Sequence, residues 1–267
     1  MKAVVFYNTE NSVAEKIADD ILKVANNCGI LSEKADLNYN SCNDIDFAFV
    51  VGGDGTIIHH AKALSMFNKP ILSINAGRVG YLANLEPSDI DKIKQLSTNN
   101  FTVEKRMLLK AELVLSNKTI TDYCINDAVI SKGALSQIID ITATIGSDML
   151  TYRADGLIAC TPTGSTAYSM SAGGPLIDPT IDTIMLTPIC SRSFFSRPLL
   201  LDSKNYVTIR ASRKNAEIFL TIDGEHSHKL EPNSYVRISK APFCAQFIKI
   251  NDNTFCSTIC RKLLSNT

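Results

Sequence analysis

The stretch FAFVVGGDGTIIHH, residues 47–60, joins an apolar run to a glycine-rich turn. The run over 47–51 is rich in aromatic and β-branched residues without alternation, which is typical of a strand covered on both faces of a sheet. The turn places one carboxylate, Asp54, among Gly52, Gly53 and Gly55, and a helix is expected over 56–66. Ligands bind beyond the carboxyl ends of the strands in an open α/β sheet, so this turn is the first candidate site.

Strand and helix alternate over the first hundred residues. Runs at 3–7 and 71–74 have the composition of buried strands, and apolar residues at helical spacing follow the first run. A capping box formed by Ser12 and Glu15 predicts the start of this helix, and Gly29 predicts its end. A further helix is expected over 87–96. Residues 1–99 are therefore predicted to form a Rossmann-like α/β domain with a parallel sheet.

The pattern changes beyond residue 100. Strand-like segments lie at 108–115, 119–125, 138–145, 206–212, 216–222 and 235–240. Several of them alternate apolar with polar residues, and turn residues separate them. A short strand at 156–160 leads into a helix expected over 164–173. Residues 100–241 are predicted to form an antiparallel β-rich domain of the β-sandwich type, which makes the fold class α/β plus β.

Composition excludes several functional classes. The chain has 267 residues, 45% of them apolar, with 27 basic and 27 acidic side chains, as in a globular protein of two modest domains. A net charge of zero gives no global attraction to nucleic acid or an anionic membrane, so neither partner is expected. The sequence has no apolar run of the length of a membrane span and no signal peptide, which predicts a cytoplasmic protein.

The eight cysteines form no C-x-x-C pair and are interpreted as buried thiols rather than as a disulfide framework. Cys256 and Cys260 lie one helical turn apart and leave open a metal-binding pair, although no second pair of ligands has suitable spacing. His226 and His228 match no zinc pattern for the same reason. The metal ligands of the chain are therefore not predicted.

Asp54 is unusual in a turn that otherwise suits phosphate. Glycines permit positive φ and close approach of backbone N–H groups, and the start of a helix attracts anions. A carboxylate repels phosphate, so Asp54 is expected either to hold a metal that bridges phosphates or to accept a proton from an attacking hydroxyl. The alternative is a tight turn in which Asp54 is only the N-cap of the next helix.

A second motif, DGLIACTPTGSTAYSMSAGGP, covers residues 155–175. It places a carboxylate, a buried strand and a Ser/Thr/Gly-rich helix start in succession, which provides many donors beside small side chains that a flat ring could contact. Its alternative is a well-capped helix. Neither a P-loop nor the G-x-G-x-x-G fingerprint occurs in the sequence, which disfavours a P-loop kinase and an ordinary hydride-transferring dehydrogenase.

Together with Asn126-Asp127 and the stretch NAGRVGYL at 75–82, these motifs resemble the NAD kinase family from residue 52 to residue 224. The resemblance implies transfer of the terminal phosphoryl group of ATP to the 2′-hydroxyl on the adenosine side of NAD, with Mg²⁺ or another divalent cation. Asp54 matches the general base, and Gly52, Gly53 and Gly55 would face the phosphates. The alternatives are a lipid or sugar kinase that shares the GGDG turn, and a non-catalytic dinucleotide-binding module.

The resemblance also implies binding residues. Asn126 and Asp127 match a pair that reads adenosine, for which a turn or strand end is the plain alternative. Arg153 and Asp155 match positions that contact nicotinamide-side or phosphate groups, with a surface ion pair as the alternative. Positions matching the lining of the dinucleotide pocket are Thr163, Thr166, Ala167, Tyr168, Ser169 and Ser171. His59 matches a basic position near the phosphates, whereas His60 is expected to be exposed.

One segment departs from the family. Residues 191–198 read SRSFFSRP, where Arg192 replaces the usual histidine while Arg197 and Pro198 remain. The resemblance further implies an assembly of identical chains, a homodimer or homotetramer, and a C-terminal segment over 242–267 that packs back on the first domain.

Overall fold

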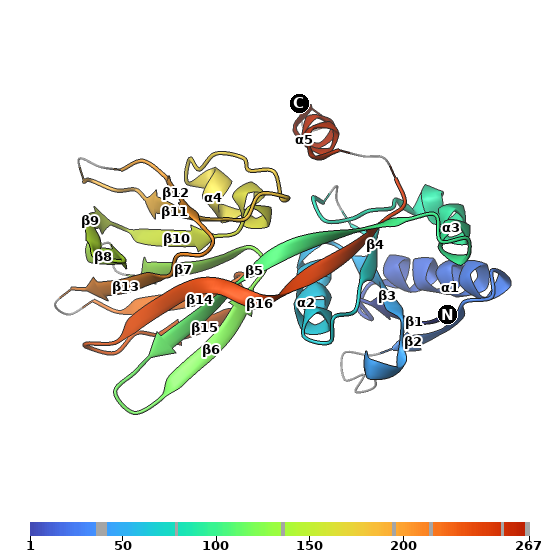
Figure 1. The fold of residues 1–267 in the computed structure, drawn as a ribbon, viewed down its shortest axis with the longest axis horizontal. Helices are drawn as coiled ribbons and strands as arrows, with labels where there is room; N and C mark the ends of the chain where they lie inside the picture. The colour runs from blue at the N-terminus through green and yellow to red at the C-terminus, as the bar shows by residue number, and fades with distance from the viewer. Residues whose placement is uncertain are drawn as a thin grey trace. The chain divides into compact units, whose positions relative to one another are not determined.

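The computed structural model describes residues 1–35, 42–77, 80–134, 137–193, 196–213, 216–251 and 254–264. The chain forms two compact units (Figure 1). Unit 1 consists of Met1–Arg106 together with Phe243–Thr267, and unit 2 consists of Met107–Pro242. The chain passes from one unit to the other within two long strands, β5 (Thr102–Val114) and β16 (Tyr235–Lys249).

Unit 1 contains a parallel sheet in the order β2-β1-β3-β4. Its strands are β1 (Lys2–Tyr7), β2 (Leu31–Ala35), β3 (Phe47–Gly52) and β4 (Ile71–Asn75). Every residue of β3 and β4 is buried, as the unalternating apolar runs predict. The sequence analysis did not predict β2. This strand has only five residues, and exposed and half-buried side chains alternate along it at the edge of the sheet. The end of β16 continues the sheet, with Phe247 opposite Ile71 in parallel register.

The helices of unit 1 begin and end at different residues from those predicted. α1 (Ser12–Asn27) has Asn11 as its N-cap, because the Asn11 side chain accepts the N–H groups of Val13 at 2.9 Å and Ala14 at 3.2 Å. The capping box at Ser12 is therefore wrong by one residue. α2 (Asp54–Ser65) begins two residues early, and the helix expected over 87–96 is a 3-10 segment, η2 (Pro87–Ile93), followed by α3 (Lys94–Ser97). A further 3-10 turn is η1 (Cys42–Asp44).

Unit 2 is a β-sandwich. One sheet has the antiparallel order β12-β11-β10-β7-β14-β15, and a second contains β16-β13-β8-β9 and the β5–β6 hairpin. Apolar side chains from both sheets form one core, in which Tyr152 is fully buried. The strands are β6 (Thr119–Cys124), β7 (Asp127–Lys132), β8 (Ile139–Ile145), β9 (Asp148–Ala154), β10 (Gly156–Cys160), β11 (Thr183–Ile189), β12 (Leu199–Asp202), β13 (Val207–Ser212), β14 (Ile218–Ile222) and β15 (His226–Lys229).

The predicted helix over 164–173 is two short turns rather than one helix. η3 (Thr163–Thr166) and α4 (Tyr168–Ser171) meet at Ala167, whose ψ of −132° lies outside the helical region. Strands β7, β9, β11, β12 and β15 were not predicted. The fold class, a Rossmann-like α/β unit and an antiparallel β-rich unit, is confirmed by the sheet topology.

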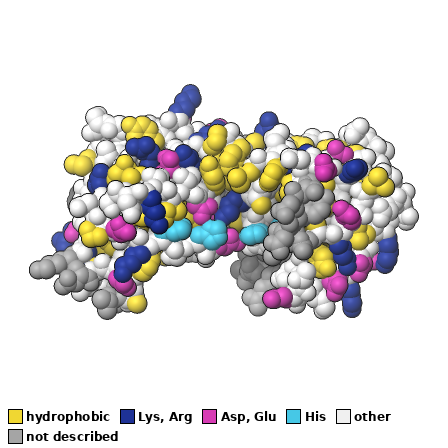
Figure 2. All heavy atoms as spheres, turned by 90° about the horizontal axis from the view of Figure 1, so that it is seen from below, with side chains coloured by type: hydrophobic (Ala, Val, Ile, Leu, Met, Phe, Trp, Pro, Cys, Tyr) yellow, Lys and Arg dark blue, Asp and Glu magenta, His cyan; other side chains and the backbone are white. Residues whose placement is uncertain are grey.

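Three further features concern the surface charge, the apolarity of the helices and the burial of the C-terminal region. Basic and acidic side chains are interspersed over the face drawn in Figure 2, in keeping with the balanced composition. In the described part of the chain, no helix has both the length and the apolarity to cross a membrane. Residues Ala245, Phe247 and Ile248 of β16 are buried, whereas the described side chains of α5 (Phe255–Leu264) are exposed or half-buried.

The cysteines differ in burial, and all are free thiols. The buried ones are Cys42, Cys124 and Cys160, and the exposed ones are Cys190, Cys256 and Cys260. The prediction of buried thiols is thus wrong for the last three. Two of these lie on α5, whose sequence gave a helical pattern without indicating how little of the helix would be covered.

Candidate functional site

Asp54 lies where β3 ends and α2 begins, and its carboxylate is held by another part of the chain. One oxygen accepts the backbone N–H of Tyr81 at 2.7 Å and the other accepts that of Leu82 at 3.1 Å. Gly53 is the N-cap of α2, so the alternative in which Asp54 only caps its own helix is wrong. A carboxylate has about four lone-pair positions, so two N–H bonds fix its orientation and leave acceptor capacity for a ligand.

Glycine at position 80 is required by the Asp54 carboxylate. A Cβ built on Gly80 would lie 2.8 Å from the Asp54 carboxyl carbon, closer than such atoms approach in real structures. The other glycines behave differently. A Cβ on Gly52 would strike the Thr56 side chain at 2.5 Å, whereas Cβ atoms on Gly53 and Gly55 would meet open space. None of Gly52, Gly53 and Gly55 has a positive φ, so the turn does not use the dihedral freedom that glycine permits.

The segment that donates to Asp54 is held in turn by β4. Ser73, which is buried, donates its hydroxyl to the Leu82 carbonyl at 2.6 Å and accepts the N–H of Asn84 at 3.1 Å. Asn75 donates to Glu86 at 2.9 Å and accepts the N–H of Gly77 at 3.0 Å. Sequence reasoning identified the 75–82 stretch as a motif but missed Ser73. The signal that could have found it is its position, since a serine inside an apolar strand needs hydrogen-bond partners.

The two histidines of α2 point to different surroundings. His59 is exposed, as the helical spacing allows. His60 is only 4% exposed and stacks on the Phe6 ring at a centroid distance of 4.4 Å, so its predicted exposure is wrong. Burial, followed by the nearby His59, lowers the pKa of His60 to about 4. His60 is therefore a neutral core residue at physiological pH and not a phosphate ligand.

Unit 2 contains a pocket of about 340 Å³ beside the start of β7. Its lining brings together four of the predicted residues, Asn126, Asp127, Ala167 and Tyr168. The remaining lining residues are Val129, Ser131, Thr221, Asp223 and Gly224. Tyr168 is 47% exposed, which leaves its ring available at the pocket. This volume is at the small end of ligand pockets and suits a group of nucleoside size.

Asp127 is an unusual carboxyl group because it is 5% exposed and lines this pocket. Burial, reinforced by the charge of Asp223, raises the pKa of Asp127 to about 7. The peptide before it is fixed by Thr161, whose N–H donates to the Asn126 carbonyl at 2.9 Å and whose hydroxyl donates to the Ile125 carbonyl at 2.5 Å. Residues from the second motif and the Asn-Asp pair therefore meet directly.

Two domain models of one protein family match the chain, and each matched region contains one of these sites. The ATP-NAD kinase N-terminal domain model matches residues 5–100, and the ATP-NAD kinase C-terminal domain model matches residues 125–250. The chain belongs to the NAD kinase family. The first matched region contains Asp54 and the second contains Asn126, Asp127 and Tyr168. The match favours this family over the lipid and sugar kinases that share the GGDG turn.

Curated relatives agree with this assignment. The chain is 36% identical to an NAD kinase of Clostridium botulinum (strain Loch Maree / Type A3) over 256 residues, which cover 93% of this chain and 91% of the relative. It is 34% identical to an NAD kinase of Caldanaerobacter subterraneus subsp. tengcongensis over 221 residues, covering 82% and 78% of the two chains.

Solved structures have the same fold. An NAD kinase from Archaeoglobus fulgidus in complex with ATP superposes with a TM-score of 0.80 at 25% identity, covering 99% of this chain and 98% of the other. A yeast NADH kinase complexed with NADH gives 0.88 at 21% identity, covering 100% of this chain and 88% of the other. At that identity the yeast structure supports the fold alone.

Several residues matched to the dinucleotide pocket of the NAD kinase family have other contacts here. Ser169 is buried, and its hydroxyl shares a hydrogen bond of 2.8 Å with Thr187. Thr163 is also buried, and its carbonyl accepts the Thr166 hydroxyl at 3.1 Å, while Ser171 is exposed on α4. Of the residues matched on η3 and α4, the pocket described above is lined by Ala167 and Tyr168.

Arg153 and Asp155 also lie apart from the lining of this pocket. Each has an ion pair, although not with the other. The guanidinium of Arg153 is 3.2 Å from Asp140, and the carboxylate of Asp155 is 2.9 Å from the ammonium of Lys132. The backbone of Arg153 also contacts the segment that departs from the family, because its carbonyl accepts the N–H of Arg192 at 2.8 Å. Phe194 and Phe195 of that segment lie outside the described residues.

Five pocket residues were not among the predicted site residues, namely Val129, Ser131, Thr221, Asp223 and Gly224. Asp223 and Gly224 were identified only as a turn. The Asp-Gly pair that follows the strand-like segment 216–222 could have indicated Asp223. Several residue types suit the first position of such a turn, so the presence of a carboxylate there is informative.

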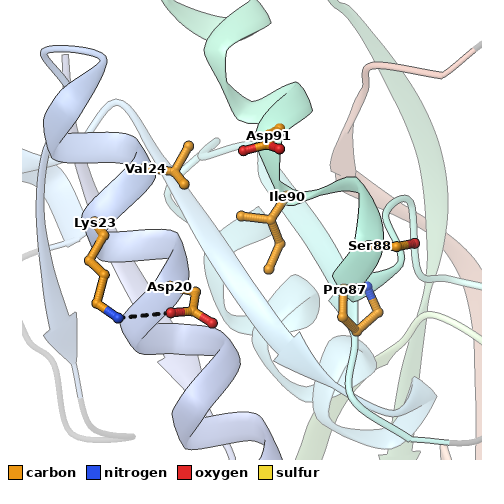
Figure 3. A pocket seen from close by; sticks show the side chains of 7 residues that line it. All are labelled: Asp20, Lys23, Val24, Pro87, Ser88, Ile90 and Asp91. Carbon is orange, nitrogen blue, oxygen red and sulfur yellow. Dashed lines mark hydrogen bonds and ion pairs between the residues drawn. The ribbon is translucent and has the colours of Figure 1, made fainter.

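A second hollow lies in unit 1 between α1 and η2 (Figure 3). Its volume is about 290 Å³. Within it, the Lys23 ammonium donates to Asp20 at 2.9 Å, as Figure 3 shows. Its lining residues are Asp20, Lys23, Val24, Pro87, Ser88, Ile90 and Asp91, none of which was a predicted site residue.

Proposed function

We propose that this chain is an NAD kinase that transfers the terminal phosphoryl group of ATP to the 2′-hydroxyl of the adenosine ribose of NAD, giving NADP and ADP. The observation that carries the proposal is the Asp54 carboxylate, oriented by two backbone N–H groups at the glycine turn of a chain matched by both ATP-NAD kinase domain models.

Asp54 would act as the general base. A ribose hydroxyl is a poor nucleophile at neutral pH, and a positioned carboxylate that accepts its proton during attack lowers the barrier. Phosphoryl transfer otherwise requires mainly alignment and charge stabilisation. The open space around Gly53 and Gly55 supports the proposal that ATP phosphates approach the backbone at the start of α2. His59, exposed on the first turns of α2, would lie on the phosphate side.

A divalent cation such as Mg²⁺ fits this arrangement as a companion of ATP. The described residues contain no group of three or more His, Cys, Asp or Glu side chains that could enclose a metal ion. Mg²⁺ commonly uses one or two carboxylates with substrate phosphates and water, and Asp54 is the carboxylate at this turn. When bound, the cation would neutralise charge on the phosphoryl group being transferred.

The pocket of unit 2 would hold the nucleoside part of NAD. Asn126 and Asp127 offer hydrogen-bonding groups for hydroxyls or an amine, and Tyr168 offers a ring face for a base. No Lys or Arg occurs among the described residues that line it, so the pocket suits an uncharged sugar or base better than a phosphate. We propose that Thr163, Thr166 and Ser169 position Tyr168. We propose that Arg153, Asp155 and Ser171 contact the rest of the dinucleotide.

We further propose a cytoplasmic assembly of identical chains, a homodimer or homotetramer, as the family resemblance implies. Among the described residues of unit 2, six large apolar side chains are exposed, including Met149, Leu200 and Tyr206, and burial of such side chains favours association. Light scattering coupled to size-exclusion chromatography tests the assembly, and a monomeric mass at micromolar concentration would contradict it.

The reaction is tested by incubating the chain with ATP, NAD and Mg²⁺ and measuring NADP with an NADP-specific cycling assay. Asp54→Asn should lower kcat by at least about 100-fold, because an amide cannot accept the proton. Asp91 is an exposed aspartate in the same unit, and the matched control Asp91→Asn should leave kcat unchanged. Absence of NADP from folded wild-type protein would reject the proposed reaction, whereas full activity of Asp54→Asn would reject only the role of Asp54.

A further inference from the structure

Asp223 connects the β14–β15 turn to the peptide that carries Asn126 and Asp127. Its carboxylate accepts three consecutive backbone N–H groups, from Ile125 at 3.0 Å, Asn126 at 2.8 Å and Asp127 at 3.1 Å. In return, the N–H of Asp223 donates to the Asp127 carbonyl at 2.9 Å. One side chain thus satisfies the donors at the point where β7 begins.

The turn itself does not require this carboxylate. Asp223 has φ of +48° and Gly224 has φ of +73°, and they are the central residues of a turn in which the N–H of Glu225 donates to the Ile222 carbonyl at 2.9 Å. Glycine, asparagine and aspartate are the residues that adopt this left-handed region most readily. Asp-Gly, Asn-Gly and Gly-Gly all suit such a turn, so the turn alone does not select aspartate over glycine or asparagine. What aspartate adds is an ionised acceptor, and hydrogen bonds from N–H groups to an ionised acceptor are about twice as strong as neutral ones.

We propose that Asp223 is a positioning residue for NAD binding, which holds the Asn126-Asp127 peptide in the geometry that the nucleoside part of NAD requires. The inference rests on the proposed function. Asp223 acts through the backbone of residues 125–127, because its oxygens are directed to those N–H groups. Thr161, the residue after β10, donates to the carbonyl groups of Ile125 and Asn126, so the peptide is held by residues that follow two different strands, β10 and β14.

The charges around Asp127 give an independent readout. Asp127 faces Asp223 from the β14–β15 turn, and it faces Cys160 on β10, a thiol whose pKa burial raises to about 12. Cys160 is therefore neutral over the range in which Asp127 titrates. Removing the Asp223 charge removes repulsion and lowers the pKa of Asp127 from about 7, although burial, the larger cause, remains.

Two substitutions separate positioning from a plain turn role. Asp223→Gly keeps, and even favours, positive φ but removes the carboxylate, whereas Asp223→Asn keeps the shape and removes the charge. The matched control is Asp202→Asn, an exposed aspartate in another turn of unit 2 that accepts a single N–H from Lys204 at 2.8 Å. The full-length protein is used throughout, with NADP formation and NAD binding by calorimetry measured separately.

Positioning predicts that Asp223→Gly raises the KM and Kd for NAD by about 10-fold or more while the KM for ATP stays near the wild-type value. Amide hydrogen exchange of residues 125–127 should become faster in both variants without ligand. In Asp223→Asn, the inflection in the pH profile of the KM for NAD should move to lower pH. Asp202→Asn should leave all of these unchanged.

The inference is overturned if Asp223→Gly binds NAD as wild type does, or if exchange at 125–127 is unaffected, because the turn alone would then explain the residue. Such a result leaves NADP formation by the wild-type protein intact. Conversely, a folded wild type that binds NAD without forming NADP rejects the proposed reaction, while the exchange and affinity measurements still decide the role of Asp223.

Discussion

Asp54 and Asp223 are carboxylates whose oxygens accept backbone N–H groups from distant parts of the chain. Charge-assisted bonds of this kind fix the orientation of an acidic side chain. At Asp54 the arrangement also depends on a missing side chain, since Gly80 provides the space that the carboxylate occupies. A single methyl group at position 80 is therefore expected to disturb the proposed base.

We expect Gly80→Ala to lower kcat for NADP formation by about 100-fold, since the added methyl must displace Asp54 and misplaced catalytic groups lose about this much. Gly77→Ala is the matched control, because its Cβ would meet the Gly53 Cα at 3.6 Å, an ordinary contact. Steady-state kinetics with ATP and NAD measure both variants. Equal losses in the two would show that the loop, rather than the Asp54 carboxylate, is sensitive to substitution.

His60 should make stability depend on pH. Its pKa is lowered to about 4 in the folded protein, so the unfolded chain takes up a proton at higher pH than the folded one. The His60 contribution to the free energy of unfolding is therefore full above about pH 6.5 and is lost as the pH falls towards 4. His60→Phe, which keeps the stacking on Phe6, should reduce this loss in urea titrations, while His228→Gln should retain it.

The sequence indicated Asp54 because residue type and position after a buried strand are local features. It could not indicate Tyr81 and Leu82, since their contribution is a backbone N–H and any residue type supplies one. His60 was misjudged for a different reason. It lies three residues after Ile57 and four before Leu64, on the apolar face of α2, and the two adjacent histidines were interpreted by polarity instead of by this spacing.

At the level of elements, burial alone did not make a strand predictable, since β3 and β4 were predicted but β11, buried at six of its seven residues, was not. β3 and β4 are continuous apolar runs, whereas β9 is mostly exposed and β7 begins at the Asn-Asp pair that usually marks a turn. Helix starts were less certain because polar residues cluster there. Asn11 and Ser12 are both good N-cap residues, and the choice between them depends on side-chain geometry that the sequence does not specify.

These two residues give a direct test of the α1 start. Asn11→Ala should lower the free energy of unfolding by about 1 kcal/mol, because the N–H groups of Val13 and Ala14 lose their acceptor. Ser12→Ala, which retains that acceptor, should change it by less than about 0.5 kcal/mol. Urea unfolding monitored by circular dichroism measures both, and a larger effect at Ser12 would restore the capping box.

At the level of the whole molecule, unit 1 is built from both ends of the sequence. The late segment contributes buried side chains, since Phe247 is 2% and Ile248 is 1% exposed. The described part of α5, by contrast, adds exposed or half-buried side chains. The two parts of the C-terminal region should therefore differ in their value to stability.

A chain ending at residue 242 should be less stable by at least about 3 kcal/mol, because burial of a Phe or Ile side chain contributes about 1.5–3 kcal/mol. A chain ending at residue 251 keeps β16 and should unfold close to the full-length protein. Calorimetry and limited proteolysis compare the two truncations. Equal stability of the chain ending at 242 would mean that the strand beside β4 is dispensable.

The division of unit 1 between the two ends of the polypeptide also has a consequence for biosynthesis. Unit 2 is a single uninterrupted stretch and can be completed while translation continues, whereas unit 1 can be completed only after Phe243 and the residues that follow it have been made. While unit 2 is being synthesised, the nascent unit 1 therefore has the β4 edge of its sheet uncovered. Chaperone binding would be most useful during this period.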